Sequence, residues 1–310
     1  MISGNSFKIK VPASTANLGP GFDSIGLALN LYLEIMVEKS ERWQVIPLSK
    51  ELEVFQNDES HFIISVAKQV AKKYYKTLPP CRLSIKSEIP LARGLGSSAS
   101  AIVAGIELAD VLGALNLTSQ QKLDIAIDFE DHPDNIGASL YGGLVIGSKN
   151  DDHTEIVSIH DLPVEIVVMI PKEELLTKES RAVLPDSFSF EVAVRAGSIS
   201  NVFIAALLSQ EWNKAGRMMR KDQYHQPFRK RLITDYDQIE GLAYKAGAFG
   251  VALSGAGPSI IGLVEAGKGK EVADNLSLVL PKMNVLCLSI DKAGSLVEPT
   301  ASIPYIRKAL

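Results

Sequence analysis

The chain has 310 residues, of which 46% are hydrophobic and 22% are charged, and its formal charge is −4 at pH 7. This length predicts two domains, and the mild acidity argues against nonspecific binding to nucleic acid. Cys81 and Cys287 stand far apart without metal-ligand residues nearby, which favours two reduced thiols over one disulfide. The N-terminus lacks the apolar run of a signal peptide, and no apolar stretch approaches the length of a membrane span. We therefore expect a soluble, cytoplasmic protein.

The N-terminal half mixes strand and helix periodicities. Alternating apolar residues predict strands over 7–11, 33–38, 81–87 and 144–147. Helical spacing predicts a helix that begins at an N-cap on Ser60 and a second helix over 97–112. Thr118 and Gln121 have the spacing of a capping box, which predicts a third helix that runs to about residue 130.

The second half alternates strands with amphipathic helices. We expect, in chain order, a strand over 164–170, helices over 188–208 and 235–246, strands over 250–254 and 260–265, a helix over 268–280 and a strand over 285–290. A polar run ends near residue 154, which places the domain boundary just beyond it and gives domains of 1–158 and 159–310. This pattern predicts an α+β protein in which each sheet carries helices on one face.

A glycine- and serine-rich loop lies between a predicted strand and a predicted helix. Glycines let the backbone approach a ligand closely, and a helix start offers unpaired N–H groups, so the loop suits a phosphate. A Walker A loop is excluded because no Lys follows Gly96. A dinucleotide fingerprint and a simple tight turn remain as less favoured alternatives. The loop consists of Pro90, Leu91, Ala92, Arg93, Gly94, Leu95, Gly96, Ser97, Ser98, Ala99, Ser100 and Ala101.

The serines at the helix start can cap the helix or place a hydroxyl on Mg²⁺, which would need an acidic partner elsewhere. The acidic turn over 130–135 supplies carboxylates, and hard oxygen ligands suit Mg²⁺ better than Zn²⁺. We expect Glu130 and Asn135 to be functional. The other polar members of the turn are expected at a solvated helix end, with the last of them as a helix cap: Asp131, His132 and Asp134.

Two further loops are candidate binding segments. Residues 11–23 form a polar, Gly/Pro-rich excursion between apolar runs, and its Asn17 and Asp23 suit a small polar ligand. Gly255 and Gly257 lie in a third glycine segment between two apolar strands. That segment is either another contact between backbone and an anion or a tight hairpin.

Taken together, these segments resemble the GHMP kinase superfamily. The Pro-x-x-x-Gly-Leu-Gly-Ser-Ser-Ala motif at 90–99 is similar to its nucleotide signature. Residues 12–23, 132–135, 180–185 and 226–229 are similar to the members that phosphorylate L-homoserine. The resemblance covers the whole chain. It implies a ribosomal-S5-like N-terminal domain and a ferredoxin-like C-terminal domain, with the site in the cleft between them.

The resemblance also implies the reaction and the residue roles. The reaction is ATP-dependent phosphorylation of the side-chain hydroxyl of L-homoserine, which gives O-phospho-L-homoserine on the route to threonine. Residues 90–101 would wrap the ATP phosphates, and Ser98 and Glu130 would hold Mg²⁺. The residues implied for homoserine are Asn17, Asp23 (facing the ammonium group), Asn135, Thr177, Arg181, and either Arg229 or Arg231 beside Arg181 for the carboxylate. A homodimer stays open.

Two departures from the superfamily pattern matter. Asn135 stands where mevalonate kinases carry a catalytic Asp, and the first loop lacks their Lys. Because an amide cannot accept a proton at neutral pH, we expect no side-chain general base at this position. Asp131 stands where Gly is common, and it could either perturb the metal site or point to solvent. Another small-molecule kinase of the superfamily and a non-catalytic ligand sensor remain as alternatives.

Overall fold

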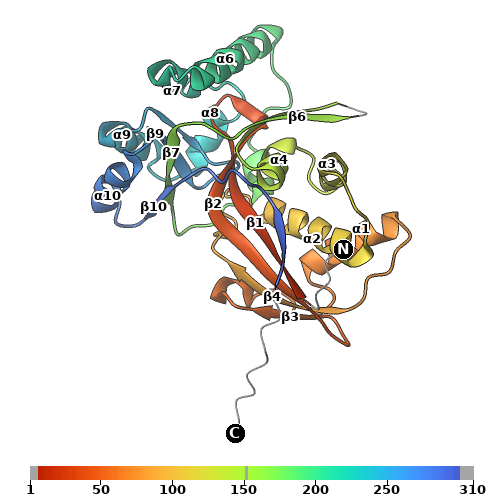
Figure 1. Ribbon diagram of the computed structural model, residues 1–310. Coiled ribbons are helices and arrows are strands. Elements are labelled where there is room, and N and C mark those ends of the chain that lie inside the picture. The colour runs from red at the N-terminus through yellow and green to blue at the C-terminus, as the bar shows by residue number, and fades with distance from the viewer. Residues whose placement is uncertain (1–5, 151–152, 301–310) are drawn as a thin grey trace.

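The computed structural model describes residues 6–150 and 153–300, and two β-sheets organise them (Figure 1). The first sheet has seven strands in the order β11-β1-β2-β4-β3, with β5 paired to β2 and β6 paired to β5. Its strands are β1 Ser6–Asn17, β2 Gly21–Lys39, β3 Gln44–Pro47, β4 Cys81–Ser87, β5 Leu144–Lys149, β6 Thr154–Ile159 and β11 Leu296–Pro299.

Strands β1 and β2 are longer than the sequence predicted. The expected excursion over 11–23 is wrong in form, because β1 continues to Asn17 and β2 begins at Gly21. Register shifts at Pro12/Ala13 and Ala16/Asn17 interrupt the regular pairing of the two strands, and the carbonyl of Ala16 accepts the N–H of Gly255 from the second domain. The polar side chains of Ser14 and Thr15 are fully buried in the interior of the molecule.

Four helices cover one face of the first sheet: α1 Phe62–Lys73, α2 Ser97–Gly113, α3 Ser119–Ile127 and α4 Pro133–Tyr141 (Figure 1). The predicted N-cap of α1 is off by one residue, because Nδ1 of His61 accepts the hydrogen bond from the N–H of Ile63. The capping box at Thr118 and Gln121 is confirmed. The short helix η1, Lys50–Leu52, lies on the connection that leads to α1.

The second sheet is antiparallel, with the strand order β10-β7-β9-β8. If the four strands are numbered 1 to 4 in chain order, their order across the sheet is 4-1-3-2. This is the ferredoxin-like order that the family resemblance implies. Helices α9 and α10 pack on it. The elements are β7 Val164–Ile170, β8 Gly250–Leu253, α9 Tyr236–Ala246, β9 Ile260–Glu265, α10 Gly269–Val279 and β10 Asn284–Leu288.

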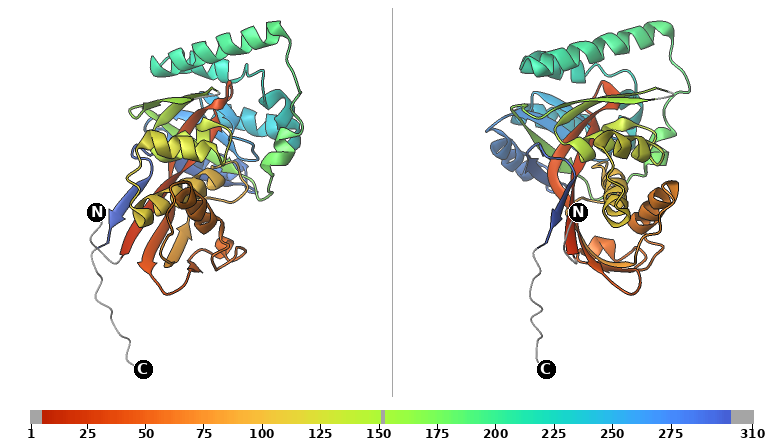
Figure 2. Two further views of the ribbon diagram at one scale, coloured as in Figure 1. Left: turned by 90° about the vertical axis from the view of Figure 1, so that its right-hand side faces the viewer. Right: turned by 45° about the vertical axis from the view of Figure 1, so that its right-hand side comes forward.

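The connection between β7 and α9 carries the remaining helices. They are α5 Thr177–Arg181, α6 Phe190–Leu208, α7 Trp212–Met219, α8 Gln226–Arg229 and the short η2 Lys230–Leu232. Helices α6 and α7 form an outer layer above both sheets, as both views in Figure 2 show. By length and composition α6 could cross a membrane, with 28% of its apolar window buried, so the expectation that no stretch approaches that length is wrong. One face of α6 nevertheless packs into the main core through Phe203 and Leu207.

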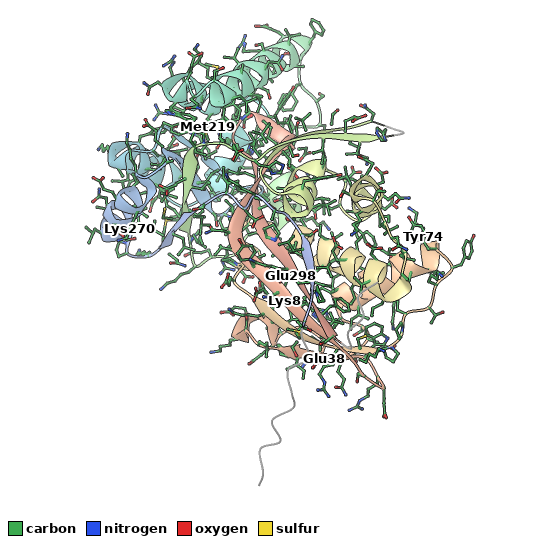
Figure 3. The ribbon with its side chains drawn as sticks, viewed as in Figure 1. Lys8, Glu38, Tyr74, Met219, Lys270 and Glu298 are labelled. Atoms are coloured by element: carbon green, nitrogen blue, oxygen red, sulfur yellow. The ribbon has the colours of Figure 1, made fainter. Side chains whose placement is uncertain are left out.

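The chain returns to the first domain at its end. Strand β11 pairs antiparallel with β1, so that Lys8 lies opposite Glu298 (Figure 3). The predicted domain of 159–310 is therefore wrong for its last described strand. A local pattern cannot show this, because the pairing joins segments almost 300 residues apart. Cys81 and Cys287 are both free thiols, as expected.

Candidate functional site

The N-terminus of α2 is the centre of the site. Its N-cap is Gly96, which has φ 72° and provides no side-chain cap for the first turn. Capping was one of the two roles open to Ser97 and Ser98, and neither serine caps this helix, since both lie inside the first turn. The N–H groups of that turn remain available to a ligand, and they lie at the positive end of the helix dipole.

Two glycines of the loop are required by close contacts. A Cβ on Gly96 would collide with the hydroxyl of Ser14 and lie 3.1 Å from Oδ1 of Asn135. A Cβ on Gly94 would collide with the carbonyl oxygen of Ser254, and both glycines have positive φ. The hydroxyl of Ser254 in turn donates to the carbonyl of Gly94 over 2.6 Å. The glycine-rich loop is thus attached to both domains.

A cavity of about 90 Å³ opens in front of this helix, and most of the predicted site residues line it. The structure brings together Asn17, Asp23, Ala92, Gly94, Leu95, Gly96, Ser97, Ser98, Ala99, Glu130, Asn135, Thr177, Arg181, Arg229 and Gly255. It also adds residues that the sequence did not assign to binding: His132, Asp134, Leu175 and Ala256.

Other predicted residues do not line this cavity. Pro90, Leu91 and Arg93 line a neighbouring cavity of about 740 Å³ instead. Ser100 and Ala101 lie farther along α2, where the Ser100 hydroxyl donates to the carbonyl of Ser97. Arg231 lies outside the cavity and donates to the carbonyls of Phe228 and Val183. Gly257 uses its N–H to reach the carbonyl of Ser254.

The third glycine segment presents a carbonyl to the site rather than its amides. The N–H of Gly255 donates to the carbonyl of Ala16, while its own carbonyl accepts from Nδ2 of Asn17 and Nη1 of Arg229. Of the two alternatives for this segment, the structure favours the hairpin, since β8 and β9 pair antiparallel on either side of it and the N–H groups of Gly255 and Gly257 already have backbone partners.

Glu130 has an unusual environment. Burial raises the pKa of its carboxyl, and the charges of His132 and Arg181 and the Ser98 hydroxyl only partly oppose this. Its Oε2 atom is buried and has no hydrogen-bond partner among the described residues. A buried carboxylate oxygen without a partner fits a cation ligand, and Ser98 lines the same cavity. Ser98 and Glu130 therefore have the donor chemistry for Mg²⁺.

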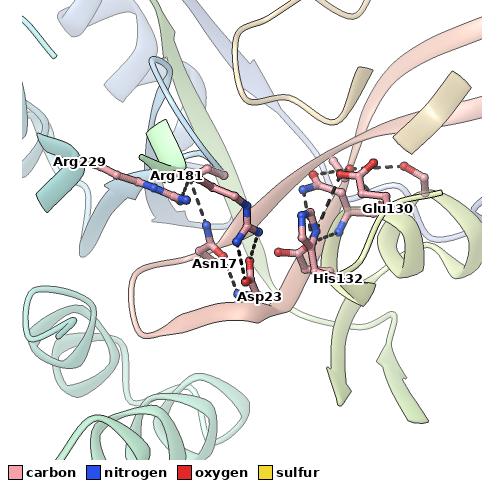
Figure 4. Close-up of polar contacts among 11 residues, drawn as sticks. Asn17, Asp23, Glu130, His132, Arg181 and Arg229 are labelled. Atoms are coloured by element: carbon pink, nitrogen blue, oxygen red, sulfur yellow. Dashed lines mark hydrogen bonds and ion pairs between the residues drawn. The ribbon is translucent and has the colours of Figure 1, made fainter. Parts of the chain in front are cut away.

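His132 and Asp134 lie in the cavity wall, so the expectation of a solvated helix end is wrong for both. His132 lies beside Glu130 (Figure 4). Oδ1 of Asp134 lies 3.0 Å from Nδ1 of His132 and accepts the N–H of Asn135 over 2.6 Å. Burial lowers the pKa of His132, but the hydrogen bond and charge of Asp134 and the charges of Glu130 and Asp23 raise it overall. The Pro that follows His132 signals the start of α4, which places His132 at the N-cap of that helix.

Asp23, His132 and Asp134 place one ligand atom each within 4.8 Å of one another. These atoms are already in use, because Asp23 pairs with Arg181 and Asp134 bonds His132 and Asn135. Asp131, in contrast, is exposed and forms an ion pair with Lys149. Of the two alternatives for Asp131, the structure favours the one that points to solvent.

Four polar side chains line the side of the cavity away from Glu130, namely Asn17, Asp23, Arg181 and Arg229 (Figure 4). Asn17 and Asp23 both have positive φ, a conformation that Asn and Asp adopt more readily than most residues, and Oδ1 of Asn17 accepts the N–H of Asp23 over 3.0 Å. Nη2 of Arg181 lies 2.8 Å from Oδ1 of Asp23. Arg229 is 2% exposed. It donates from Nε to the carbonyl of Ser180 and from Nη1 to that of Gly255.

Arg229 is a buried cation whose hydrogen-bond partners, among the described residues, are carbonyl oxygens and not carboxylates. Burial lowers its pKa to about 10, and the charge of Arg181 acts in the same direction. Burial of a guanidinium without an anionic partner is costly. An anionic group of a ligand in this cavity would compensate the charge.

Comparison with known proteins assigns the family. Residues 61–143 match the GHMP kinases N terminal domain, and residues 203–282 match the GHMP kinases C terminal domain. The chain is 49% identical over 291 residues to a homoserine kinase of Bacillus cereus, with 94% of this chain and 96% of the relative covered. It is 46% identical over 292 residues to a homoserine kinase of Bacillus licheniformis, with 94% and 95% covered.

Solved structures agree with this assignment. A crystal structure of homoserine kinase from Cytophaga hutchinsonii superimposes with a TM-score of 0.84 at 25% identity, covering 96% of this chain and 98% of that one. A mevalonate kinase structure shares the fold at 19% identity, with a TM-score of 0.68 over 91% of this chain and 98% of that one. The chain therefore belongs to the homoserine kinases, a branch of the GHMP kinase family.

Proposed function

We propose that this protein transfers the γ-phosphoryl group of ATP to the side-chain hydroxyl of L-homoserine. The observation that carries the choice of substrate is the buried, uncompensated guanidinium of Arg229 beside the Asp23 carboxylate in one cavity. An amino acid has a carboxylate for the first group and an ammonium for the second, whereas a sugar or mevalonate lacks one or both charges. Guanidinium groups bind carboxylates in a bidentate manner.

The nucleotide is proposed to lie across both cavities. The first turn of α2 offers unpaired N–H groups for the phosphates, and Ser98 and Glu130 would hold Mg²⁺, which neutralises charge on the phosphates when bound. Pro90 and Leu91 lead from this turn into the cavity of about 740 Å³. Its walls include the apolar residues Leu52 and Ile89, and its size suits the adenosine part of ATP.

The residues at the acceptor end are suited to positioning the substrate. Oδ1 of Asn135 already accepts a hydrogen bond from the Ser14 hydroxyl over 2.9 Å, which fixes the amide beside the phosphate loop. The amide can bind a substrate hydroxyl but cannot remove its proton. Phosphoryl transfer relies mainly on alignment and charge neutralisation, so the absence of a base at this position is compatible with catalysis. Thr177 lines the same cavity and is proposed to contact the substrate.

A panel of hydroxyl acceptors tests this function. L-homoserine, L-serine, mevalonate, galactose and shikimate are each incubated with Mg-ATP, and both ADP release and product mass are recorded. We expect homoserine to give a product heavier by one phosphoryl group and to exceed every other acceptor in kcat/KM by a wide margin. A different preferred acceptor would overturn the assignment of the substrate, and ATP binding without turnover of any acceptor would favour a ligand sensor. The cytoplasm is the proposed compartment.

A further inference from the structure

Phe22 has no role in the scheme above, yet its ring touches both arginines of the substrate wall. The ring centroid lies 5.1 Å from Cζ of Arg229 and 5.6 Å from Cζ of Arg181. Both distances are within the range of cation–π attraction. Phe22 is also the residue directly before Asp23 on β2, so one short segment contacts every charged group of this wall.

Two guanidinium groups beside one ring repel each other, and this repulsion contributes to the lowered pKa of Arg229. Arg229 has carbonyl hydrogen-bond partners on Nε and Nη1, and Arg181 is held by Asp23. An aromatic face attracts a guanidinium cation without occupying the N–H groups of that cation. The ring of Phe22 can therefore hold the two cations close together without occupying further N–H groups, and Nη2 of Arg229 has no hydrogen-bond partner among the described residues.

The ring itself is held firmly in place. It stacks on the imidazole of His225 with centroids 5.4 Å apart and an interplanar angle of 20°. His225 is fully buried, and its Nε2 donates to the carbonyl of Gly19 over 2.9 Å. His225 is also the N-cap of α8, the helix that carries Arg229. The turn before Phe22 and the helix of Arg229 are thus joined through this stack.

We propose that Phe22 is a positioning and specificity residue that holds the guanidinium groups of Arg181 and Arg229 side by side for one substrate carboxylate. This inference rests on the proposed function, since it assigns the carboxylate end of the homoserine pocket. The residue acts through the two arginines and not on the reacting atoms. Its loss therefore weakens binding of the carboxylate more than it slows phosphoryl transfer.

The first test compares Phe22→Leu with Phe188→Leu. Phe188 is an edge-on neighbour of Tyr224 and Phe228 in the adjoining aromatic cluster and lines no part of the cavity, so its replacement is a matched loss of one ring. KM and kcat are measured for L-homoserine and for its carboxamide, which lacks the negative charge; where the amide turns over too slowly, it is measured as a competitive inhibitor.

We expect Phe22→Leu to raise the homoserine KM by about tenfold, the size of one lost cation–π contact in a partly desolvated site, with kcat within about threefold of wild type. The KM or inhibition constant of the carboxamide should change by less than about twofold. Phe188→Leu should leave the constants of both ligands unchanged. An equal loss for homoserine and its amide would overturn the inference, because a general distortion of the pocket acts on both.

A second series keeps the shape of the ring. Phe22 is replaced by mono-, di- and trifluorophenylalanine, which weaken the attraction of the ring for cations without removing it. A stepwise rise in homoserine KM at constant thermal stability supports the inference, and an unchanged KM overturns it. Failure of the proposed function has a different signature, namely a wild-type enzyme that does not phosphorylate homoserine at all.

Discussion

Asp23 and Arg181 bind each other through two contacts, from Nη2 to Oδ1 over 2.8 Å and from Nη1 to Oδ2 over 3.2 Å. In the proposed function these two groups hold opposite ends of the same amino acid. A bound zwitterion would therefore replace an internal ion pair with two new ones. A ligand with a single charge would leave one partner of the pair uncompensated, which is unfavourable in a partly buried site.

This exchange predicts opposite effects of Asp23→Asn on two ligands. The homoserine KM should rise about tenfold or more, because the ammonium loses a charged hydrogen-bond partner. The KM or inhibition constant of 4-hydroxybutyrate, which has only the carboxylate, should fall, because Arg181 no longer pairs with Asp23. Steady-state kinetics with both ligands measure this. Parallel weakening of both would contradict the exchange.

Glu130→Gln tests the proposed metal site. We expect kcat to fall by about 10²-fold or more, since the buried Oε2 position would lose its charge beside the phosphates. Asp131→Asn is the matched control, because the carboxylate of Asp131 follows Glu130 in the sequence but is exposed and paired with Lys149. It should stay within about twofold of wild type, as expected for an exposed ion pair. ADP release is measured over a range of Mg²⁺ concentrations, and equal losses in the two variants would remove Glu130 from the metal site.

Gly96→Ala tests the phosphate loop. The new Cβ would collide with the Ser14 hydroxyl at a positive φ, so the helix start must shift and the KM for ATP should rise strongly. Gly197→Ala inside α6 is the control, because nothing lies within 4 Å of its Cβ position. That change should leave kinetics unaltered and raise the free energy of unfolding by up to about 1 kcal/mol. Thermal denaturation and ATP titration measure the two effects, and normal ATP use by Gly96→Ala would refute the assigned close approach.

Arg229→Lys predicts a change with pH. Burial and the charge of Arg181 lower the pKa of the Arg229 guanidinium to about 10, so the wild type keeps this cation throughout the physiological range. A lysine starts from an ordinary pKa of about 10.4, and the same environment would lower it further. Above about pH 8 the variant should therefore lose its cation and its homoserine affinity earlier than wild type. Parallel profiles of log(kcat/KM) against pH for the two enzymes would contradict this.

Much of the fold could be predicted from local patterns. The capping box at Thr118, the strand over 81–87 and the helix after the glycine loop depend on neighbours in sequence, and the structure has all of them. The return of β11 to β1 depends on pairing between the two ends of the chain, which no local pattern contains. The length of β1 was missed because its polar residues are buried by segments distant in sequence, Ser14 by Asn135 of α4 and Thr15 by Ser254 of the second domain.

The candidate site also has some residues that local sequence signals predict and others that only the three-dimensional contacts identify. The glycine loop and Glu130 have signals in their own residue types and spacing. Arg229 could not be distinguished from Arg231, because two basic residues on one short helical segment look alike until their neighbours are known. The structure separates them, since Arg229 is buried and Arg231 faces outward. The sequence gives no signal for Phe22, and the role proposed for it rests on its place between His225 and the two arginines.

The hydrogen bond between the hydroxyl of Ser254 and the carbonyl of Gly94 also constrains how the enzyme can move. It anchors the phosphate loop to the second domain at the very point where the domains meet. A hinge motion that swings one domain away from the other would have to break this contact.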